Sequence, residues 1–455
     1  MVSLALLAFI ALIAVLGLKR PFLWVLLYIY VDIVIPQKIG WGIINSLPLS
    51  LMVFVLAFGG WAVLDGKQGS RFTFRQLLIV MLLAWCGMTT ITAQFQDSAW
   101  EKWNWVWKCL LFAAFLPLTL RTKLRLEAAV LVIVLSIGAI VISGGLKTAL
   151  GGGGYGTLTM LVDDNAGIYE GSIISTAAIA VIPLVLWCAK FGTIFKPEWR
   201  VTAFAAALIF ACLLIPVGTS ARTGLVCIGV LGLLLMRTAQ HRFAYGAAAA
   251  AALVVAMPFL PASFTDRMGT IIGYQGDQSA STRLAVWQWT MDYAKDHPLG
   301  GGFDAYRANS FTYQTRNVSG EGGNVLVEFS EVTEEARAYH SSYFELLGEQ
   351  GYPGLAMWLL LQAMGVWQME QIRRRFTRKG EPPTWQAGLA NALQQAQLVY
   401  LVGAAFVGIA FQPFIFLLVG LQISLASLAR RMPLAQEVAA KPWLKGQTAD
   451  GVAQT

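Results

Sequence analysis

The sequence predicts an all-α polytopic membrane protein with about 12 transmembrane helices and one large extracytoplasmic loop. Hydrophobic residues make up 57% of the 455 residues and charged residues only 13%, against about a quarter in soluble domains. Apolar runs recur along the chain, and each is long enough to cross roughly 30 Å of hydrocarbon. These observations together exclude an ordinary soluble fold.

The predicted membrane segments follow the hydrophobic runs in order. They lie near residues 3–18, 21–37, 48–64, 76–93, 104–120, 125–145, 172–191, 200–217, 222–237, 243–260, 342–367, 392–411 and 413–429. The break at Lys19-Arg20-Pro21 can join the first two segments as a short hairpin, so 12 or 13 crossings are expected.

Lys and Arg gather in alternate loops between these segments, which predicts the orientation of the chain. The basic loops centre on residues 67–75, 121–125, 190–200, 237–242, 373–379 and 430–431. The positive-inside rule places them in the cytoplasm and places residues 261–341 outside. The positive net charge is therefore attributed to membrane orientation and not to a nucleic-acid partner.

Four regions follow from this pattern. Residues 1–260 carry transmembrane helices 1 to about 10, and residues 261–341 form a polar loop with ten acidic and six basic residues. Residues 342–432 carry the last transmembrane helices, and residues 433–455 form a polar tail that is expected to be disordered. A polar interval this long, rich in aromatic residues and glycine, predicts a folded functional cap.

The cap is expected to contain amphipathic helices. Ser281-Thr282 can cap a helix from Arg283 to about Lys295. The following Gly300-Gly301-Gly302 run ends it and allows close backbone approach. A second helix is expected to start within residues 334–338 and to carry His340, with a break at residues 351–354.

Arg222 and Arg283 are candidate anion-binding residues. Arg222 opens a predicted membrane helix on the outer side, where a lone arginine runs against the positive-inside bias and marks a functional site. Arg283 starts the cap helix beside two hydroxyls, a setting that can hold an anionic group. The alternatives are an interfacial anchor for Arg222 and a solvated surface arginine for Arg283.

His340 stands where the polar cap returns to the membrane. A neutral imidazole at that position could accept a proton from a sugar hydroxyl. The alternative is a histidine that only forms a local hydrogen bond.

The Asp163-Asp164-Asn165 sequence is a weak candidate for a divalent metal, and a solvated turn is favoured there. The five cysteines all fall in apolar segments, so no disulfide framework or metal site is expected.

Three short motifs around this loop resemble the O-antigen ligase family, which shares its core pattern with O-antigen polymerases and protein O-glycosylation ligases. The first is Ser-Ala-Arg-Thr-Gly around Arg222, and the second is Ser-Thr-Arg-Leu-Ala-Val-Trp around Arg283 with a later His-Pro-Leu-Gly-Gly-Gly-Phe. The third begins at His340 and continues Ser-Ser-Tyr-Phe-Glu-Leu-Leu-Gly-Glu-Gln-Gly. The resemblance covers about residues 200–365.

The resemblance implies a GT-C-like glycosyltransferase in the bacterial inner membrane, with its active site facing the periplasm. The implied donor is a glycan on undecaprenyl diphosphate and the implied acceptor is lipid A–core oligosaccharide, without cofactor or catalytic metal. Arg222 and Arg283 would then bind the diphosphate, His340 would be the general base, and Tyr339 and Arg337 would contact substrate. The alternatives are a glycan polymerase, a protein O-oligosaccharyltransferase and, as a non-enzyme, a transporter of lipid-linked glycan.

Overall fold

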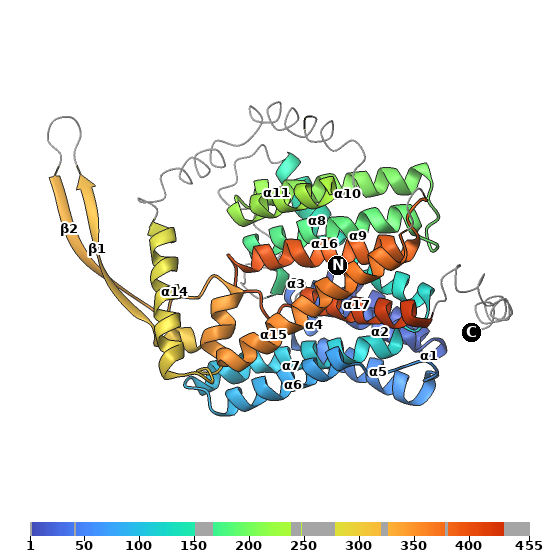
Figure 1. Ribbon diagram of the computed structural model, residues 1–455, viewed down its shortest axis with the longest axis horizontal. Helices are drawn as coiled ribbons and strands as arrows, with labels where there is room; N and C mark the ends of the chain where they lie inside the picture. Colours follow the sequence, from blue (N-terminus) through green and yellow to red (C-terminus); the bar gives the residue numbers. More distant parts are fainter. Residues whose placement is uncertain are drawn as a thin grey trace.

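The hydrophobic runs of the sequence become a bundle of helices (Figure 1). The computed structural model describes residues 2–40, 42–150, 167–237, 247, 278–319, 326–377 and 381–431. The first helices are α1 (Val2–Lys19), α2 (Phe22–Val34), α3 (Pro36–Ile39), α4 (Ile43–Ser46), α5 (Leu49–Leu64), α6 (Phe74–Ile91), α7 (Gln96–Thr119) and α8 (Lys123–Leu150).

The second part of the chain adds the remaining helices and one pair of strands. These elements are η1 (Gly167–Tyr169), α9 (Gly171–Phe191), α10 (Trp199–Gly218), α11 (Arg222–Met236), α14 (Gln278–Asp296), η4 (Ala305–Ala308), β1 (Ser310–Ser319), β2 (Leu326–Glu335), α15 (Ser342–Arg375), α16 (Trp385–Ala404) and α17 (Pro413–Arg431).

Each membrane segment predicted within the described residues overlaps a helix, although the segment at 392–411 extends beyond the end of α16 at Ala404. The segment at 243–260 lies outside the described ranges, apart from residue 247. Five described helices, α6, α8, α9, α10 and α17, are long and apolar enough to cross a membrane, and α1, α2, α5 and α11 are shorter apolar helices. The multi-pass membrane class is thus supported, and the number of crossings stays a prediction.

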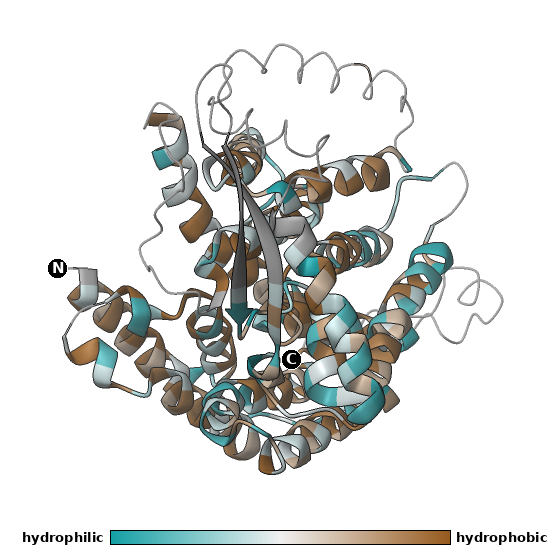
Figure 2. Ribbon diagram, turned by 90° about the vertical axis from the view of Figure 1, so that its left-hand side faces the viewer, coloured by the Kyte–Doolittle hydropathy of each residue, from teal (hydrophilic) through white to brown (hydrophobic). Residues whose placement is uncertain are grey.

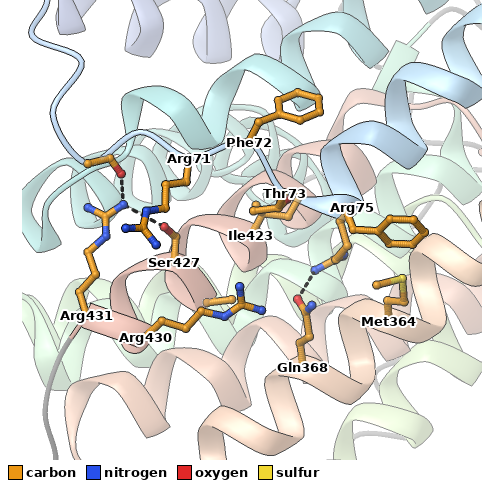
Figure 3. Close-up of a pocket in the computed structure, with 13 residues that line it drawn as sticks. Arg71, Phe72, Thr73, Arg75, Met364, Gln368, Ile423, Ser427, Arg430 and Arg431 are labelled. Atoms are coloured by element: carbon orange, nitrogen blue, oxygen red, sulfur yellow. Dashed lines mark hydrogen bonds between the residues drawn. The ribbon is translucent and has the colours of Figure 1, made fainter.

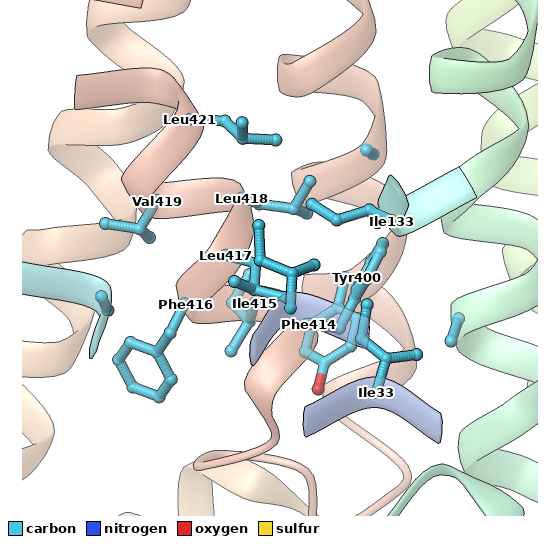
Figure 4. Packing of buried hydrophobic residues seen from close by; sticks show 14 of the residues in the cluster. Ile33, Ile133, Tyr400, Phe414, Ile415, Phe416, Leu417, Leu418, Val419 and Leu421 are labelled. Carbon is cyan, nitrogen blue, oxygen red and sulfur yellow. The ribbon is translucent and has the colours of Figure 1, made fainter. Parts of the chain in front are cut away.

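The interior of the bundle is apolar, and so is much of its outside. Helices α9 and α17 are largely buried, and Figure 4 shows Tyr400 of α16 against Phe414 and its neighbours on α17. Hydrophobic residues also occupy outward faces of the bundle helices (Figure 2). Val63 and Phe210, for example, are 81% and 61% exposed. An outer surface of this kind suits contact with lipid.

The cap departs from the predicted all-α fold because it contains a β-hairpin. Strands β1 and β2 pair antiparallel from Ser310 opposite Glu335 to Ser319 opposite Leu326, and they project from the end of the bundle beside α14 (Figure 1). The predicted start of the second cap helix is therefore wrong, and that helix does not carry His340. Residues through Glu335 are strand, Ala336 and His340 have positive φ angles, and α15 begins only at Ser342.

The first predicted cap helix exists, but it begins earlier than expected. Helix α14 starts at Gln278, so Ser281-Thr282 lies within its first turns and does not cap it. Arg283 consequently stands in the second turn of α14 and not at its amino terminus. The amino terminus of α14 therefore lies more than one turn before Arg283, and the predicted contribution of that terminus to anion binding at Arg283 is not supported.

The predicted close approach at the glycine run is confirmed. Gly301 and Gly302 N–H groups donate to the carbonyls of Gly348 and Glu349, at 2.9 Å each. Gly302 has φ +81°, and a Cβ atom there would lie 2.4 Å from the Cβ of Ala93. The predicted break in α15 is also present, because Gly351 is non-helical with φ +65°. Both features dock the cap directly onto the bundle.

Candidate active site at the cap end of the bundle

His340 lies in the short connection between β2 and α15, and its backbone is strained. Its φ angle of +47° falls in the left-handed region, which is unfavourable for a residue with a side chain. Such conformations cost about 1–3 kcal/mol and persist only where neighbouring contacts impose them. The surroundings of His340 should therefore show contacts that fix this short segment on both sides.

Those contacts come from the cap. The Asn309 side chain accepts from the Arg337 N–H and donates to the Arg337 carbonyl, at 2.8 Å in each case. The Trp287 indole of α14 donates to the Tyr339 carbonyl at 2.8 Å, and its ring stacks on Phe344 with centroids 4.9 Å apart. Asn309 and α14 together hold the segment that carries His340.

The residues that follow His340 are fixed to the bundle. Ser342 Oγ donates to the Val407 carbonyl at 2.9 Å and accepts from the Ile409 N–H at 2.8 Å. Ser342 is fully buried and Ser341 is 1% exposed, whereas the His340 side chain reaches the surface. The imidazole is thus presented outward from an anchored backbone.

Three charged side chains act on the His340 imidazole. Partial burial and the positive charge of Arg283 lower the pKa of His340 below its usual value of 6.5, and Arg337 acts in the same direction. Glu170, which accepts from the Ile173 N–H at the start of α9, raises that pKa against them. The net effect keeps His340 neutral near pH 7, as a general base requires.

Not all of the predicted site residues lie beside the His340 imidazole. Arg283 and Arg337 are electrostatic neighbours of the imidazole. Tyr339 is 3% exposed with its ring against Tyr306, so its side chain faces the interior. Arg337 also pairs with Glu334.

Arg222 is the first residue of α11, after Ser220 with φ +50°. The turn that carries it packs on the start of α9, where Thr219 Oγ1 and Ser175 Oγ are 2.9 Å apart. Glu170 lies at that same start of α9. Arg222 therefore belongs to the end of the bundle that carries His340.

A buried charge cluster beneath the site was not predicted. Lys102 Nζ lies 2.7 Å from a Glu345 oxygen and 2.8 Å from a Glu349 oxygen. Glu349 also accepts from the Asp304 N–H at 3.0 Å. The two glutamates belong to the motif that starts at His340, and Lys102 comes from α7. The sequence offered one sign of this cluster, a lysine next to an apolar run. The predicted membrane segment began at residue 104, so Lys102 was left outside that segment.

A cleft of about 520 Å³ opens at this end of the molecule. Its wall combines residues of α2 and α7, among them Asp32, Lys102 and Lys108, with Arg307 of η4 and Glu345 of α15. The lining carries both signs of charge and several hydrogen-bonding groups. Such a surface suits a polar, multiply hydroxylated ligand more than an apolar one.

Strained backbone is concentrated around the site and the cleft. The non-glycine residues with positive φ among those described are Ile35, Ser220, Asp304, Ala336 and His340. Ile35 and Asp304 line the cleft, and the other three adjoin the candidate site residues. Concentrated strain of this kind is typical of functional sites.

The Asp163-Asp164 candidate lies outside the described residues. Among the described residues, no group of three or more His, Cys, Asp or Glu side chains could hold a metal ion.

Comparison with known families divides the chain in two. Residues 1–193 match a family of unknown function (DUF5935), and residues 205–359 match the family described as O-Antigen ligase. No curated protein matches the chain. The second match contains Arg222, Arg283, Arg337, Tyr339 and His340, whereas most of the cleft wall comes from the first. Residues 205–359 therefore form an O-antigen ligase family domain, which supports an O-antigen ligase- or polymerase-type function at a membrane.

Proposed function

We propose that the protein is an O-antigen ligase of the bacterial inner membrane. It transfers a glycan from undecaprenyl diphosphate to a sugar hydroxyl of lipid A–core oligosaccharide at the periplasmic face. The observation that carries the proposal is His340, a neutral imidazole on an anchored, strained backbone within the family-matched segment. The other predicted residues take their roles around it.

The proposed reaction is a direct displacement with inversion at the anomeric carbon. His340 accepts the proton of the acceptor hydroxyl while the acceptor oxygen attacks that carbon. The bond between the anomeric carbon and the diphosphate oxygen breaks, and undecaprenyl diphosphate leaves with the electron pair. Glu170 lies close enough to favour the imidazolium that results, because its charge raises the pKa of His340. The proton is then lost to water.

Arg222 and Arg283 bind the leaving diphosphate in this proposal. A guanidinium presents a planar set of donors that matches phosphate oxygens and stabilises the charge that develops on them. Arg283 is placed for this role by α14, within electrostatic range of His340. Arg222 approaches from the start of α11. No cofactor is assigned to the reaction.

Arg337 and Tyr339 receive different roles. Arg337 is exposed beside the imidazole and remains our candidate for contact with substrate. The Tyr339 ring is buried and its carbonyl receives the Trp287 indole, which favours a positioning role. The mixed-charge cleft between α2, α7 and α15 provides a hydroxyl-binding surface near the site for part of a glycan.

The purified protein in liposomes tests the proposal, with a lipid-linked donor of several repeats supplied with or without lipid A–core. A ligase should transfer the intact glycan to lipid A–core and should leave the donor unchanged without the acceptor. Longer lipid-linked chains formed without acceptor would instead identify a polymerase. Movement of donor across the bilayer without covalent product would identify a transporter. Transfer to an added protein would identify a protein O-oligosaccharyltransferase.

A further inference from the structure

A second pocket lies between the amino-terminal end of α6, the later part of α15 and the carboxy-terminal end of α17 (Figure 3). Its volume is about 730 Å³. Four arginines line it, namely Arg71, Arg75, Arg430 and Arg431, and none of the described lining residues is acidic. The proposed transfer reaction uses no part of this pocket.

This basic pocket lies at the end of the bundle opposite His340. Arg75 near the start of α6 contacts Leu361 and Gln368 of α15, whereas Thr89 near the end of α6 contacts Gln350. Ser342 and Gln368 are 26 positions apart on α15. At a rise of about 1.5 Å per residue, the distance between them along the helix is at most about 39 Å. That separation is comparable to the roughly 30 Å thickness of the hydrocarbon layer.

Arg75 is a buried cation whose partners among the described residues are all neutral. It is 2% exposed, and its guanidinium donates to Gln422 Oε1 at 2.9 Å, Gln368 Oε1 at 3.2 Å and the Leu361 carbonyl at 3.4 Å. Its Nε has no hydrogen-bond partner among the described residues. Buried charges are normally paired with an opposite charge. An anion in the pocket would supply that charge.

The remaining arginines add to this positive field. Arg431 donates to the Gly69 carbonyl and to Ser427 Oγ, which are neutral acceptors (Figure 3). Arg71 and Arg430 are exposed and form no hydrogen bond or ion pair with the described residues. The pocket therefore presents four guanidiniums without a neutralising carboxylate on its described wall.

The pocket also has an apolar side. Phe72 and Phe74 are 58% and 60% exposed at its edge, and Met364 and Ile423 complete this part of the lining. A free inorganic anion would make no use of these side chains. A phospholipid would, because its phosphate can meet the arginines while its acyl chains lie along the apolar residues.

We propose that this pocket binds the phosphate headgroup of an anionic phospholipid. The positive-inside pattern places these arginines at the cytoplasmic leaflet, whose anionic lipids are attracted by basic pockets between transmembrane helices. The proposal goes beyond the transfer reaction and does not depend on it. The lipid phosphate would be the counter-charge of Arg75, and the lipid would contact α6, α15 and α17 at once.

The test compares two double variants of the full chain in delipidated detergent micelles. Arg71→Gln with Arg430→Gln removes two exposed pocket cations and leaves the Arg75 hydrogen bonds in place. The loop variant, Lys196→Gln with Arg200→Gln, removes one exposed cation from the α9–α10 loop and one from the first turn of α10, and neither lines the pocket. Thermal unfolding is followed while phosphatidylglycerol, phosphatidylcholine or inorganic phosphate is added. The midpoint without lipid checks that each variant is folded.

Phosphatidylglycerol should stabilise the wild type and the loop variant equally. The pocket variant should need about tenfold more lipid for the same stabilisation, the loss expected for roughly 1.4 kcal/mol of phosphate contact. An equal lipid response in both variants would overturn the proposal, as would equal stabilisation by phosphatidylcholine. Inorganic phosphate alone giving the full effect would overturn the lipid assignment and indicate a site for a free anion.

Discussion

The two ends of the bundle surround a cation in opposite ways, with Lys102 half-buried at one end and Arg75 buried at the other. At the end that carries His340, Lys102 lies between Glu345 and Glu349, so its charge is offset within the protein. At the other end, Arg75 has only amide and carbonyl oxygens around it among the described residues. The charge of Lys102 is thus offset by carboxylates of the protein, whereas the pocket around Arg75 leaves positive charge for an external anion.

The two ends of the bundle also differ in how much strained backbone they contain. Each described non-glycine residue with a positive φ lies around the candidate active site or its cleft, and none lines the basic pocket. Strain at the His340 end is imposed by Asn309, Trp287 and Ser342 through hydrogen bonds. One end therefore has a strained backbone held by hydrogen bonds and a cation paired within the protein, and the other has a basic pocket that we propose binds lipid.

Removing each of these cations tests the electrostatic difference most strongly. Lys102→Met leaves two buried carboxylates without their partner and should lower the free energy of unfolding by about 3–5 kcal/mol. Arg75→Met leaves only neutral acceptors and should lower it by about 1–3 kcal/mol. Thermal or denaturant unfolding in detergent measures both effects. Adding Glu345→Gln and Glu349→Gln to Lys102→Met should restore part of the loss. An equal loss in Lys102→Met and Arg75→Met would remove the distinction between the two ends.

Arg222→Lys tests the anion-binding role at the His340 end. A lysine keeps the positive charge but cannot form the bidentate hydrogen bonds that a guanidinium makes to a phosphate. Transfer should fall by about 100-fold, the scale of one lost transition-state donor. Arg200→Lys, at an exposed position in the first turn of α10, is the matched control and should retain full activity. Near-normal turnover by Arg222→Lys would remove Arg222 from the mechanism.

The pH dependence of transfer tests the charges around His340 and should show a smaller effect. The base must be neutral, so activity falls as the pH drops through the lowered pKa of His340. Arg283→Gln removes a charge that lowers this pKa, so the acid limb of residual activity should move to higher pH. Glu170→Gln removes a charge that raises it, so the limb should move to lower pH. Shifts in the same direction in both variants would contradict the assignment.

The sequence predicted most of the helices because long apolar runs have one stable form in a membrane. The expected segments 200–217 and 172–191, for example, correspond to helices Trp199–Gly218 and Gly171–Phe191. The glycine run at 300–302 and the break at Gly351 were also predicted, because few other residues permit their backbone geometry. These features depend on local properties of the chain.

The parts that sequence reasoning missed depend on contacts between distant segments. The hairpin of β1 and β2 was not predicted within the all-α cap, because its polar residues carry no membrane signal and its pairing depends on contacts between the two strands. His340 was placed inside a helix, and only the hydrogen bonds from Asn309 and Trp287 show why it lies before one. The pairing of Lys102 with Glu345 and Glu349 joins residues more than 200 positions apart.

The most direct test of the central claim compares His340→Ala with His297→Ala in the reconstituted transfer reaction. His297 is the matched control, because it stacks on Tyr293 at the end of α14 and takes no part in the proposed chemistry. His340→Ala should lower the transfer rate by about 10²–10⁴-fold, the usual contribution of a general base, while His297→Ala stays near wild type. If His340→Ala transfers glycan at the wild-type rate, His340 is not the base and the proposed mechanism is wrong.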